Sequence, residues 1–82
     1  MLTTKVYLPT GERVQAFVET LTSLDGEFEL LSDGYILDAR SLMGIFSLDL
    51  SKPIDLKIYN DSQKNLEALR PFTATGQEEV ST

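Results

Sequence analysis

The chain has 82 residues, 41% of them hydrophobic, carries a formal net charge of -6, and contains neither histidine nor cysteine. A chain of this length forms one domain, because compact domains usually run roughly 50 to 250 residues. Without cysteine there is no disulfide, thiolate metal site or thiol nucleophile, and without histidine the usual general base at neutral pH is missing. These absences argue against an enzyme, and we expect neither a cofactor nor a bound metal ion.

The acidic balance and the lack of long apolar stretches narrow the choice of partners. The chain has 13 Asp and Glu against 7 Lys and Arg, so its field repels nucleic acid and anionic lipid. The longest apolar stretch, near residues 42–46, is far shorter than the roughly 20 residues of a membrane span. Residues 1–5 contain no apolar region of a signal peptide. We therefore expect a cytoplasmic protein that binds neither nucleic acid nor membrane.

The first half of the chain predicts a strand, a helix and a β-hairpin. Residues 4–8 alternate between apolar and polar, which is typical of a half-buried strand. Apolar residues then recur at helical spacing from Val14 to Leu24, and Asp25-Gly26 is expected to end that helix. The next two apolar runs flank Asp33-Gly34, which favours a two-residue type I′ turn because both positions need positive φ.

The residues after the hairpin predict a second, short helix. Its apolar residues extend from Leu42 to Leu48, and either Ser41 or Asp38 is expected to cap its N-terminus. Gly44 lowers the stability of a helix, so it either permits close packing or marks a turn-like helix.

The last elements are a strand and a helix. Residues 54–58 alternate after Pro53, and residues 60–62 offer cap chemistry for a helix that Pro71 stops or kinks. We expect a single domain over residues 1–72 and a mobile polar tail over residues 73–82.

The predicted order β-α-β-β-α-β-α indicates an α+β fold. A mostly antiparallel four-stranded sheet would carry three helices on a single face, since each amphipathic helix has one apolar stripe to bury. The opposite face of the sheet would be polar. We expect it to carry Lys5, Tyr7, Glu27, Glu29, Asp55, Lys57 and Tyr59.

One block of sequence resembles a known family. Asp38-Ala39-Arg40-Ser41-Leu42-Met43-Gly44-Ile45-Phe46-Ser47-Leu48 is similar to the signature Asn-Ala-Lys-Ser-Ile-Met-Gly, two apolar residues and Ser-Leu, of HPr. HPr is the small phosphocarrier protein of the sugar phosphotransferase system. The element order, the position of the Asp-Gly hairpin and the length also agree, over residues 4–72. The resemblance implies the open-faced β-sandwich of the HPr family.

The second signature of the HPr family is absent. HPr begins its first helix with Gly-Leu-His-Ala-Arg-Pro, whose histidine accepts phosphate from enzyme I, whereas this chain has Gly11-Glu12-Arg13-Val14. When the apolar pairs that follow are aligned, the loop is about three residues shorter and neither the histidine nor the proline has a counterpart. Glu12 would also repel a phosphoryl group. We therefore interpret Gly11, Glu12 and Arg13 as a degenerate phosphocarrier loop and do not transfer the carrier role.

The resemblance also implies a regulatory serine. In Gram-positive relatives an ATP-dependent HPr kinase phosphorylates the serine of Ser-Ile-Met-Gly, and the product acts with a catabolite repressor. Ser41 holds that position. A phosphate there would meet the free N–H groups of a helix N-terminus. The other interpretation of Ser41 is a helix cap and nothing more.

Arg40, Leu42, Met43 and Phe46 are the candidate partner-binding residues. Leu42, Met43 and Phe46 cannot all point inward together with Ile45 and Leu48 on one short helix, so we expect some of them to be exposed. In HPr the matching positions dock on enzyme I, the kinase and the repressor. The competing interpretation is that they fill gaps in the core.

Two other functions stay open at this point. The chain could be a small-ligand or subunit-binding α+β domain unrelated to sugar transport, with Tyr7, Lys57 and Tyr59 as its contact residues. It could also be a residual phosphocarrier that uses an acidic or serine acceptor near Gly11. The first hypothesis, a non-catalytic regulatory module with protein partners from the phosphotransferase system, best combines the composition with the motif.

Overall fold

A computed structural model describes residues 1–74 and contains the elements in the predicted order. The sheet is formed by four strands, namely β1 (Leu2–Val6), β2 (Phe28–Ser32), β3 (Tyr35–Asp38) and β4 (Ile54–Ile58). The helices are α1 (Gly11–Thr22), α2 (Leu42–Phe46) and α3 (Gln63–Leu69), and α3 is followed by a 3-10 turn over Arg70–Phe72. The predicted α+β class and the three helices are confirmed.

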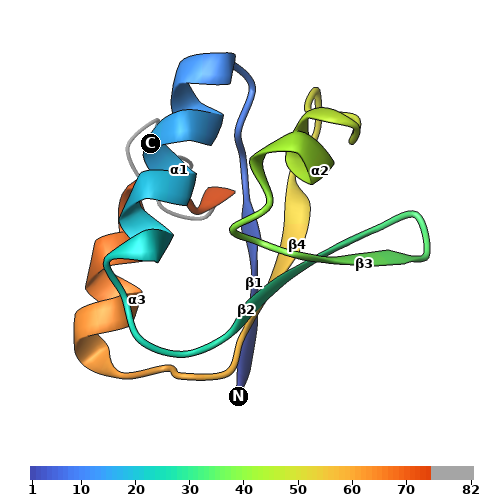
Figure 1. The fold of residues 1–82 in the computed structure, drawn as a ribbon. Helices are drawn as coiled ribbons and strands as arrows, with labels where there is room; N and C mark the ends of the chain where they lie inside the picture. The colour runs from blue at the N-terminus through green and yellow to red at the C-terminus, as the bar shows by residue number, and fades with distance from the viewer. Residues whose placement is uncertain (75–82) are drawn as a thin grey trace.

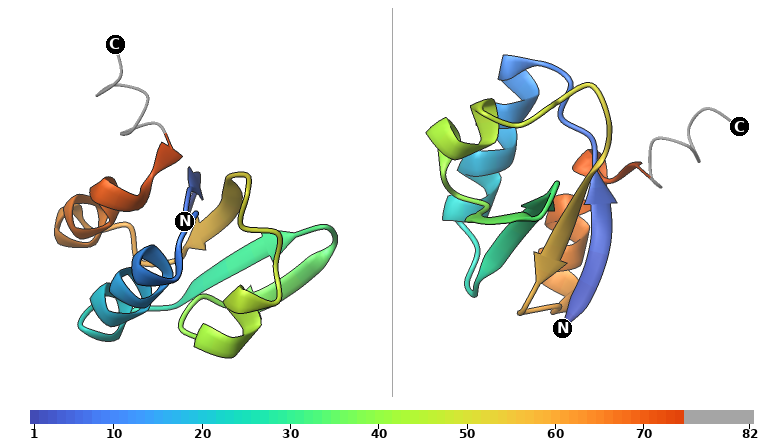
Figure 2. Two further views of the ribbon diagram at one scale, coloured as in Figure 1. Left: turned by 90° about the horizontal axis from the view of Figure 1, so that it is seen from above. Right: turned by 90° about the vertical axis from the view of Figure 1, so that its right-hand side faces the viewer.

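All strand pairs are antiparallel, and the strand order is β1-β4-β2-β3. The last strand of the chain therefore lies between the first two. In β4, Ile54, Leu56 and Ile58 are buried toward the helices, while Asp55 and Lys57 lie on the other face. Helices α1 and α3 lie on one side of the sheet, and the β2–β3 hairpin extends away from them (Figure 1). The two further views show the open sheet from other directions (Figure 2).

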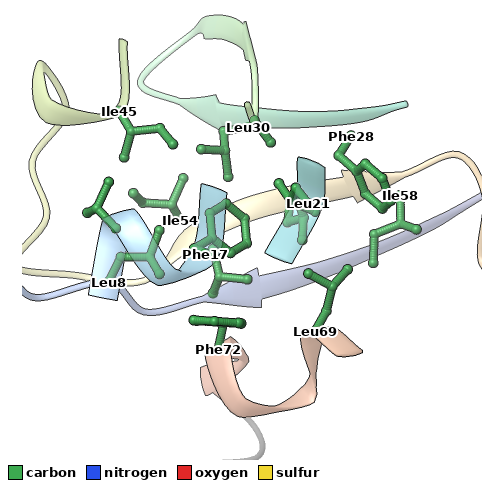
Figure 3. Close-up of a cluster of buried hydrophobic side chains, with 14 of the residues drawn as sticks. Leu8, Phe17, Leu21, Phe28, Leu30, Ile45, Ile54, Ile58, Leu69 and Phe72 are labelled. Carbon is green, nitrogen blue, oxygen red and sulfur yellow. The ribbon is translucent and has the colours of Figure 1, made fainter. Parts of the chain in front are cut away.

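The core lies between the sheet and helices α1 and α3. Phe17 and Leu21 of α1 point into it together with Leu69 and Phe72 from the C-terminal elements (Figure 3). The rings of Phe17 and Phe72 meet edge to face, with centroids 5.4 Å apart, which is a favourable geometry for an aromatic pair. The apolar residues of α1 thus form one buried face, as their spacing predicts. This face packs between the sheet and the C-terminal elements, α3 and the 3-10 turn.

The bounds of the first two elements differ from the prediction. Strand β1 ends at Val6, and α1 already begins at Gly11 because the Thr10 hydroxyl accepts a hydrogen bond from the Arg13 N–H at 3.2 Å. The helix ends at Thr22, before Leu24. Leu24 nevertheless remains buried, so its apolar character reflects core packing after the helix has ended.

The hairpin has the predicted turn. Asp33 and Gly34 both have positive φ, 50° and 83°, between the paired residues Ser32 and Tyr35. This is the backbone that a two-residue type I′ turn requires.

The end of the described chain returns to the sheet. Thr73 pairs with Val6, and the N–H of Tyr7 donates to the Phe72 carbonyl at 2.9 Å. The packed region therefore includes Thr73, the first residue of the predicted tail. Residues 75–82 of that tail lie outside the described residues. Within residues 1–74, the structure has no helix of the length and apolar character that a membrane span needs.

One buried polar side chain joins the two loops at the other end of the sheet. Asn65 of α3 is 2% exposed, and its amide donates to the carbonyls of Asp25 at 2.9 Å and Asn60 at 3.0 Å. The Asn60 amide also donates to the Asp25 carbonyl, at 3.2 Å. These bonds fix the loop between α1 and β2 against the loop between β4 and α3.

We predict that Asn65→Ala lowers the free energy of unfolding by about 1–3 kcal/mol, because the Asn60 carbonyl loses the hydrogen bond from this buried amide and the Asp25 carbonyl keeps only the one from Asn60. Urea denaturation followed by circular dichroism measures this loss. Gln63→Ala, at an exposed position of the same helix, is the matched control and should change the stability by less than about 0.5 kcal/mol. Equal stability of the two variants would contradict the role of Asn65.

Candidate functional site

Helix α2 carries the most exposed apolar side chain on the helical side of the molecule. Met43 is 84% exposed and Phe46 46% exposed, whereas Ile45 is fully buried and Leu42 is half-buried. The prediction that some of these residues are exposed is therefore confirmed. The exposed side chains of Met43 and Phe46 add little to the stability of the core, and that they bind a partner remains a prediction.

Phe46 connects this helix to the first turn of α1. A Cβ built on Gly11 would lie 3.7 Å from Cε1 and Cζ of Phe46, and Glu12 beside it is exposed. We call the surface formed by Gly11, Glu12, Ser41, Leu42, Met43 and Phe46 the α1–α2 surface. The sequence motif indicated the residues of this surface that come from α2 and its N-cap. No pattern in the sequence indicated that Gly11 and Glu12, in the first turn of α1, lie beside them.

Ser41 is the N-cap of α2. Its hydroxyl oxygen accepts a hydrogen bond from the Gly44 N–H at 3.2 Å, and its carbonyl accepts one from the Ile45 N–H at 3.0 Å. Asp38, the other candidate cap, instead accepts a hydrogen bond from the Arg40 N–H at 2.8 Å. The side chain of Ser41 is half-buried and so has a partly open approach.

Gly44 permits the close packing around Ser41. A Cβ at this position would lie 2.9 Å from Oγ of Ser41 and 2.9 Å from Cδ1 of Leu37. Of the two interpretations that the sequence left open, close packing is the one the structure supports. The glycine lets the hydroxyl and the edge strand approach the same helical turn.

Arg40 has its guanidinium turned toward the C-terminus of α1. It donates to the carbonyls of Leu21 at 3.1 Å and Leu24 at 2.8 Å, and its guanidinium carbon lies 5.1 Å from the centre of the Phe28 ring. The cation thus lies where the negative end of the helix dipole of α1 favours positive charge. The sequence analysis missed this role. That Arg40 also binds a partner remains a prediction.

The Arg13 side chain likewise has its partners within the protein. Its Nη2 donates to the Pro71 carbonyl at 2.6 Å, and its guanidinium carbon lies 4.9 Å from the centre of the Phe72 ring. The guanidinium thus holds the C-terminal turn against the start of α1. Of the three residues interpreted as a degenerate phosphocarrier loop, Gly11 and Glu12 form part of the α1–α2 surface.

Polar groups on the open face of the sheet are paired with one another. Lys5 forms an ion pair with Asp55 at 2.6 Å, and the Tyr59 hydroxyl donates to Glu29 at 2.7 Å. The Lys57 ammonium lies 5.8 Å from the centre of the Tyr59 ring. The hydrogen bond to Glu29 is the main reason that the pKa of Tyr59 is raised. Within residues 1–74 no three acidic side chains gather closely enough to hold a metal ion.

No protein-family model matches the chain. Its structure is similar to the crystal structure of HPr-C-His from Thermoanaerobacter tengcongensis, with 26% sequence identity, a TM-score of 0.65 and coverage of 83% of each chain. This likeness confirms the HPr-like open-faced sandwich that the motif implies. It also supports a relation to the phosphotransferase system and to its proteins as partners. An HPr-like fold is that of a phosphocarrier, which is compatible with a protein that is not an enzyme.

We predict that Glu29→Ala lowers the pKa of Tyr59, because the phenol loses the carboxylate that accepts its hydrogen bond and opposes its ionisation. Absorbance of the ionised phenol, followed through an alkaline titration and compared with Tyr59→Phe, measures the change. An unchanged titration of Tyr59 would contradict the pairing on the open face.

Proposed function

We propose that this chain is a regulatory and protein-interaction module of the HPr type, that it does not carry phosphate on histidine, and that it docks through the α1–α2 surface. The single observation that carries the proposal is the exposure of Met43 and Phe46 directly after Ser41, on an HPr-like fold. The partners that the resemblance implies are an HPr kinase, a catabolite repressor and other components of the phosphotransferase system.

The loss of carrier chemistry follows from the residues at the start of α1. The chain contains no histidine, so the nitrogen acceptor of the family is missing. Glu12 is exposed in the first turn, and the Arg13 guanidinium is bound to the Pro71 carbonyl. A phosphoryl group near Gly11 would thus meet a carboxylate and would have to compete for the arginine. A regulatory or docking role needs neither group.

Phosphorylation of Ser41 is the regulatory step of the proposal. The Gly44 N–H already donates to its hydroxyl oxygen, and a phosphate oxygen could accept the same hydrogen bond. The modification would add about two negative charges beside Met43 and Phe46. Because the chain already carries a net charge of -6, and Arg40 is bound to the carbonyls of Leu21 and Leu24, no nearby guanidinium would neutralise the phosphate. The α1–α2 surface would change from apolar to strongly anionic.

The alternative of ligand binding on the open sheet face has less support. Tyr59 and Lys57, two of its proposed contact residues, already interact with Glu29 and with each other. A ligand would have to replace these contacts. Chemical-shift perturbation confined to this face, on addition of a metabolite mixture, would favour that alternative.

We predict that HPr kinase and ATP add one phosphate to Ser41. Mass spectrometry of the intact chain and of its peptides measures the modification. Ser41→Ala should remove it, whereas Ser47→Ala, at the other end of the same helix, should leave it unchanged.

Phosphoenolpyruvate and enzyme I, used in place of the kinase and ATP, should leave the chain unmodified because it has no histidine. Phosphoryl transfer in that reaction would contradict the loss of the carrier role. Modification of Ser47 with Ser41 untouched would contradict the regulatory role of Ser41.

We predict that Met43→Ser and Phe46→Ala each weaken binding of the kinase at least about tenfold, since each removes an apolar contact of roughly 1.5–3 kcal/mol. Isothermal titration calorimetry measures the affinity. Leu2→Ser, which alters a partly exposed leucine on β1, is the matched control and should bind like the parent chain. If all three variants bound equally, the α1–α2 surface would not be the docking site.

A further inference from the structure

The two edges of the sheet differ in how they are protected. The edge at β1 presents Thr3, Thr4 and Lys5, and the Val6–Thr73 bridge continues it. The edge at β3 presents Tyr35 and Ile36, which are 71% and 62% exposed, and has no neighbouring strand within the described chain. Proteins usually protect free edges with charged residues or a covering segment, because unpaired backbone groups there invite another strand.

The backbone of Ile36 faces outward at this edge. Across the two-residue turn, Ser32 and Tyr35 form a hydrogen-bonded pair, so the next pair, Leu31 and Ile36, is a non-hydrogen-bonded one. The N–H and C=O of Ile36 therefore point away from β2. The same alternation turns the N–H of Asp38 outward. Strand β3 thus offers a short ladder of donors and acceptors to an added strand.

Acidic hollows lie on both sides of Ile36. One has a volume of about 310 Å³ and includes Asp33 and Asp55 in its lining. The other has a volume of about 180 Å³ and is lined in part by Glu27, Glu29 and Asp38. Ile36 lines both hollows.

Arg40 and Lys5, two basic side chains near this edge, already have partners within the protein. Arg40 lines the smaller hollow, but its guanidinium is bound to the carbonyls of Leu21 and Leu24, and Lys5 is paired with Asp55. The edge therefore combines an exposed apolar residue with an excess of negative charge.

We propose that the β3 edge binds an extended segment of a partner protein that adds an antiparallel strand. The segment carries an apolar residue opposite Ile36 and Lys or Arg residues next to the flanking carboxylates. Main-chain hydrogen bonds to Ile36 and Asp38 supply the register, and charge complementarity selects the partner. This proposal does not rest on the α1–α2 surface.

Charge disfavours a second copy of the chain as the occupant. Each copy has a net charge of -6, and pairing two β3 strands would bring Asp33 and Asp38 of both copies together. Like charges across a strand pair are destabilising. A basic segment would instead be attracted by Asp33 and Asp38.

The probe is the synthetic peptide acetyl-Lys-Lys-Thr-Val-Thr-Lys-amide, whose valine lies opposite Ile36 when the second lysine lies opposite Asp38. Titration into the ¹⁵N-labelled full chain should shift the amide resonances of Ile36 and Asp38 and slow their hydrogen exchange. The amides of Tyr35 and Leu37, which already face β2, should keep their exchange rates. The matched peptide with Glu in place of each Lys should bind at least about tenfold more weakly.

Two variants separate the apolar and the electrostatic contributions. Ile36→Ser should weaken binding of the basic peptide about tenfold, because the exposed side chain loses its apolar contact. Asp33→Asn keeps the positive-φ turn, which Asn tolerates, and should weaken binding and its dependence on salt. Met43→Ser, on the α1–α2 surface, is the control that should bind the peptide like the parent chain.

Three results would overturn the proposal. The first is equal binding of the acidic and basic peptides, and the second is a set of shifts confined to α2 or to the open face near Tyr59. The third is dimerisation of the chain in sedimentation experiments that Ile36→Ser abolishes, since the occupant would then be a second copy.

Discussion

The position of β4 between β1 and β2 is the constraint from which the rest of the structure follows. Ile54, Leu56 and Ile58 bury one face of this strand completely, while Asp55 and Lys57 face outward. A strand paired on both edges and apolar on one face obliges all helices to pack on that face. The same arrangement leaves β3 as a free edge and exposes the other face, where Lys5 and Asp55 form their ion pair. Both proposed surfaces are consequences of this topology.

The α1–α2 surface depends on small residues at close contacts. Gly44 lets Leu37 and the Ser41 hydroxyl approach the same helical turn, and Gly11 lies beside the Phe46 ring. Arg40 donates hydrogen bonds to the carbonyls of Leu21, in the last turn of α1, and Leu24, just after it, and so fixes the chain just before α2. Ser41 is consequently held in one place by its own helix and by its neighbour in sequence. Phosphorylation of Ser41, as proposed above, would change the charge of the surface without a change of fold.

The basic side chains of Arg13, Arg40 and Lys5 have partners within the protein, whereas several acidic side chains of residues 1–74 do not. Arg13 and Arg40 donate to backbone carbonyls, and Lys5 is paired with Asp55. These basic side chains therefore serve the fold, while carboxylates remain at the β3 edge and beside the start of α1. The net charge of -6 fits the basic partner segment proposed at the β3 edge, whereas the partner proposed at α2 would be recognised by the exposed apolar side chains there.

The sequence alone determined the element order, the type I′ turn at Asp33-Gly34 and the HPr-like class, because each depends on neighbours in the chain or on a local motif. It left the N-cap of α2 open between Ser41 and Asp38, and the structure decided for Ser41. Helix α1 ends before Leu24, which is nevertheless buried. Core packing, rather than helical periodicity, therefore accounts for the apolar character of this residue. Only the tertiary structure decided the roles of the arginines and the exposure of Ile36 and Phe46. These depend on the strand order and on contacts between residues far apart in the chain, such as Arg40 with Leu21 or Gly11 with Phe46, which no local pattern records.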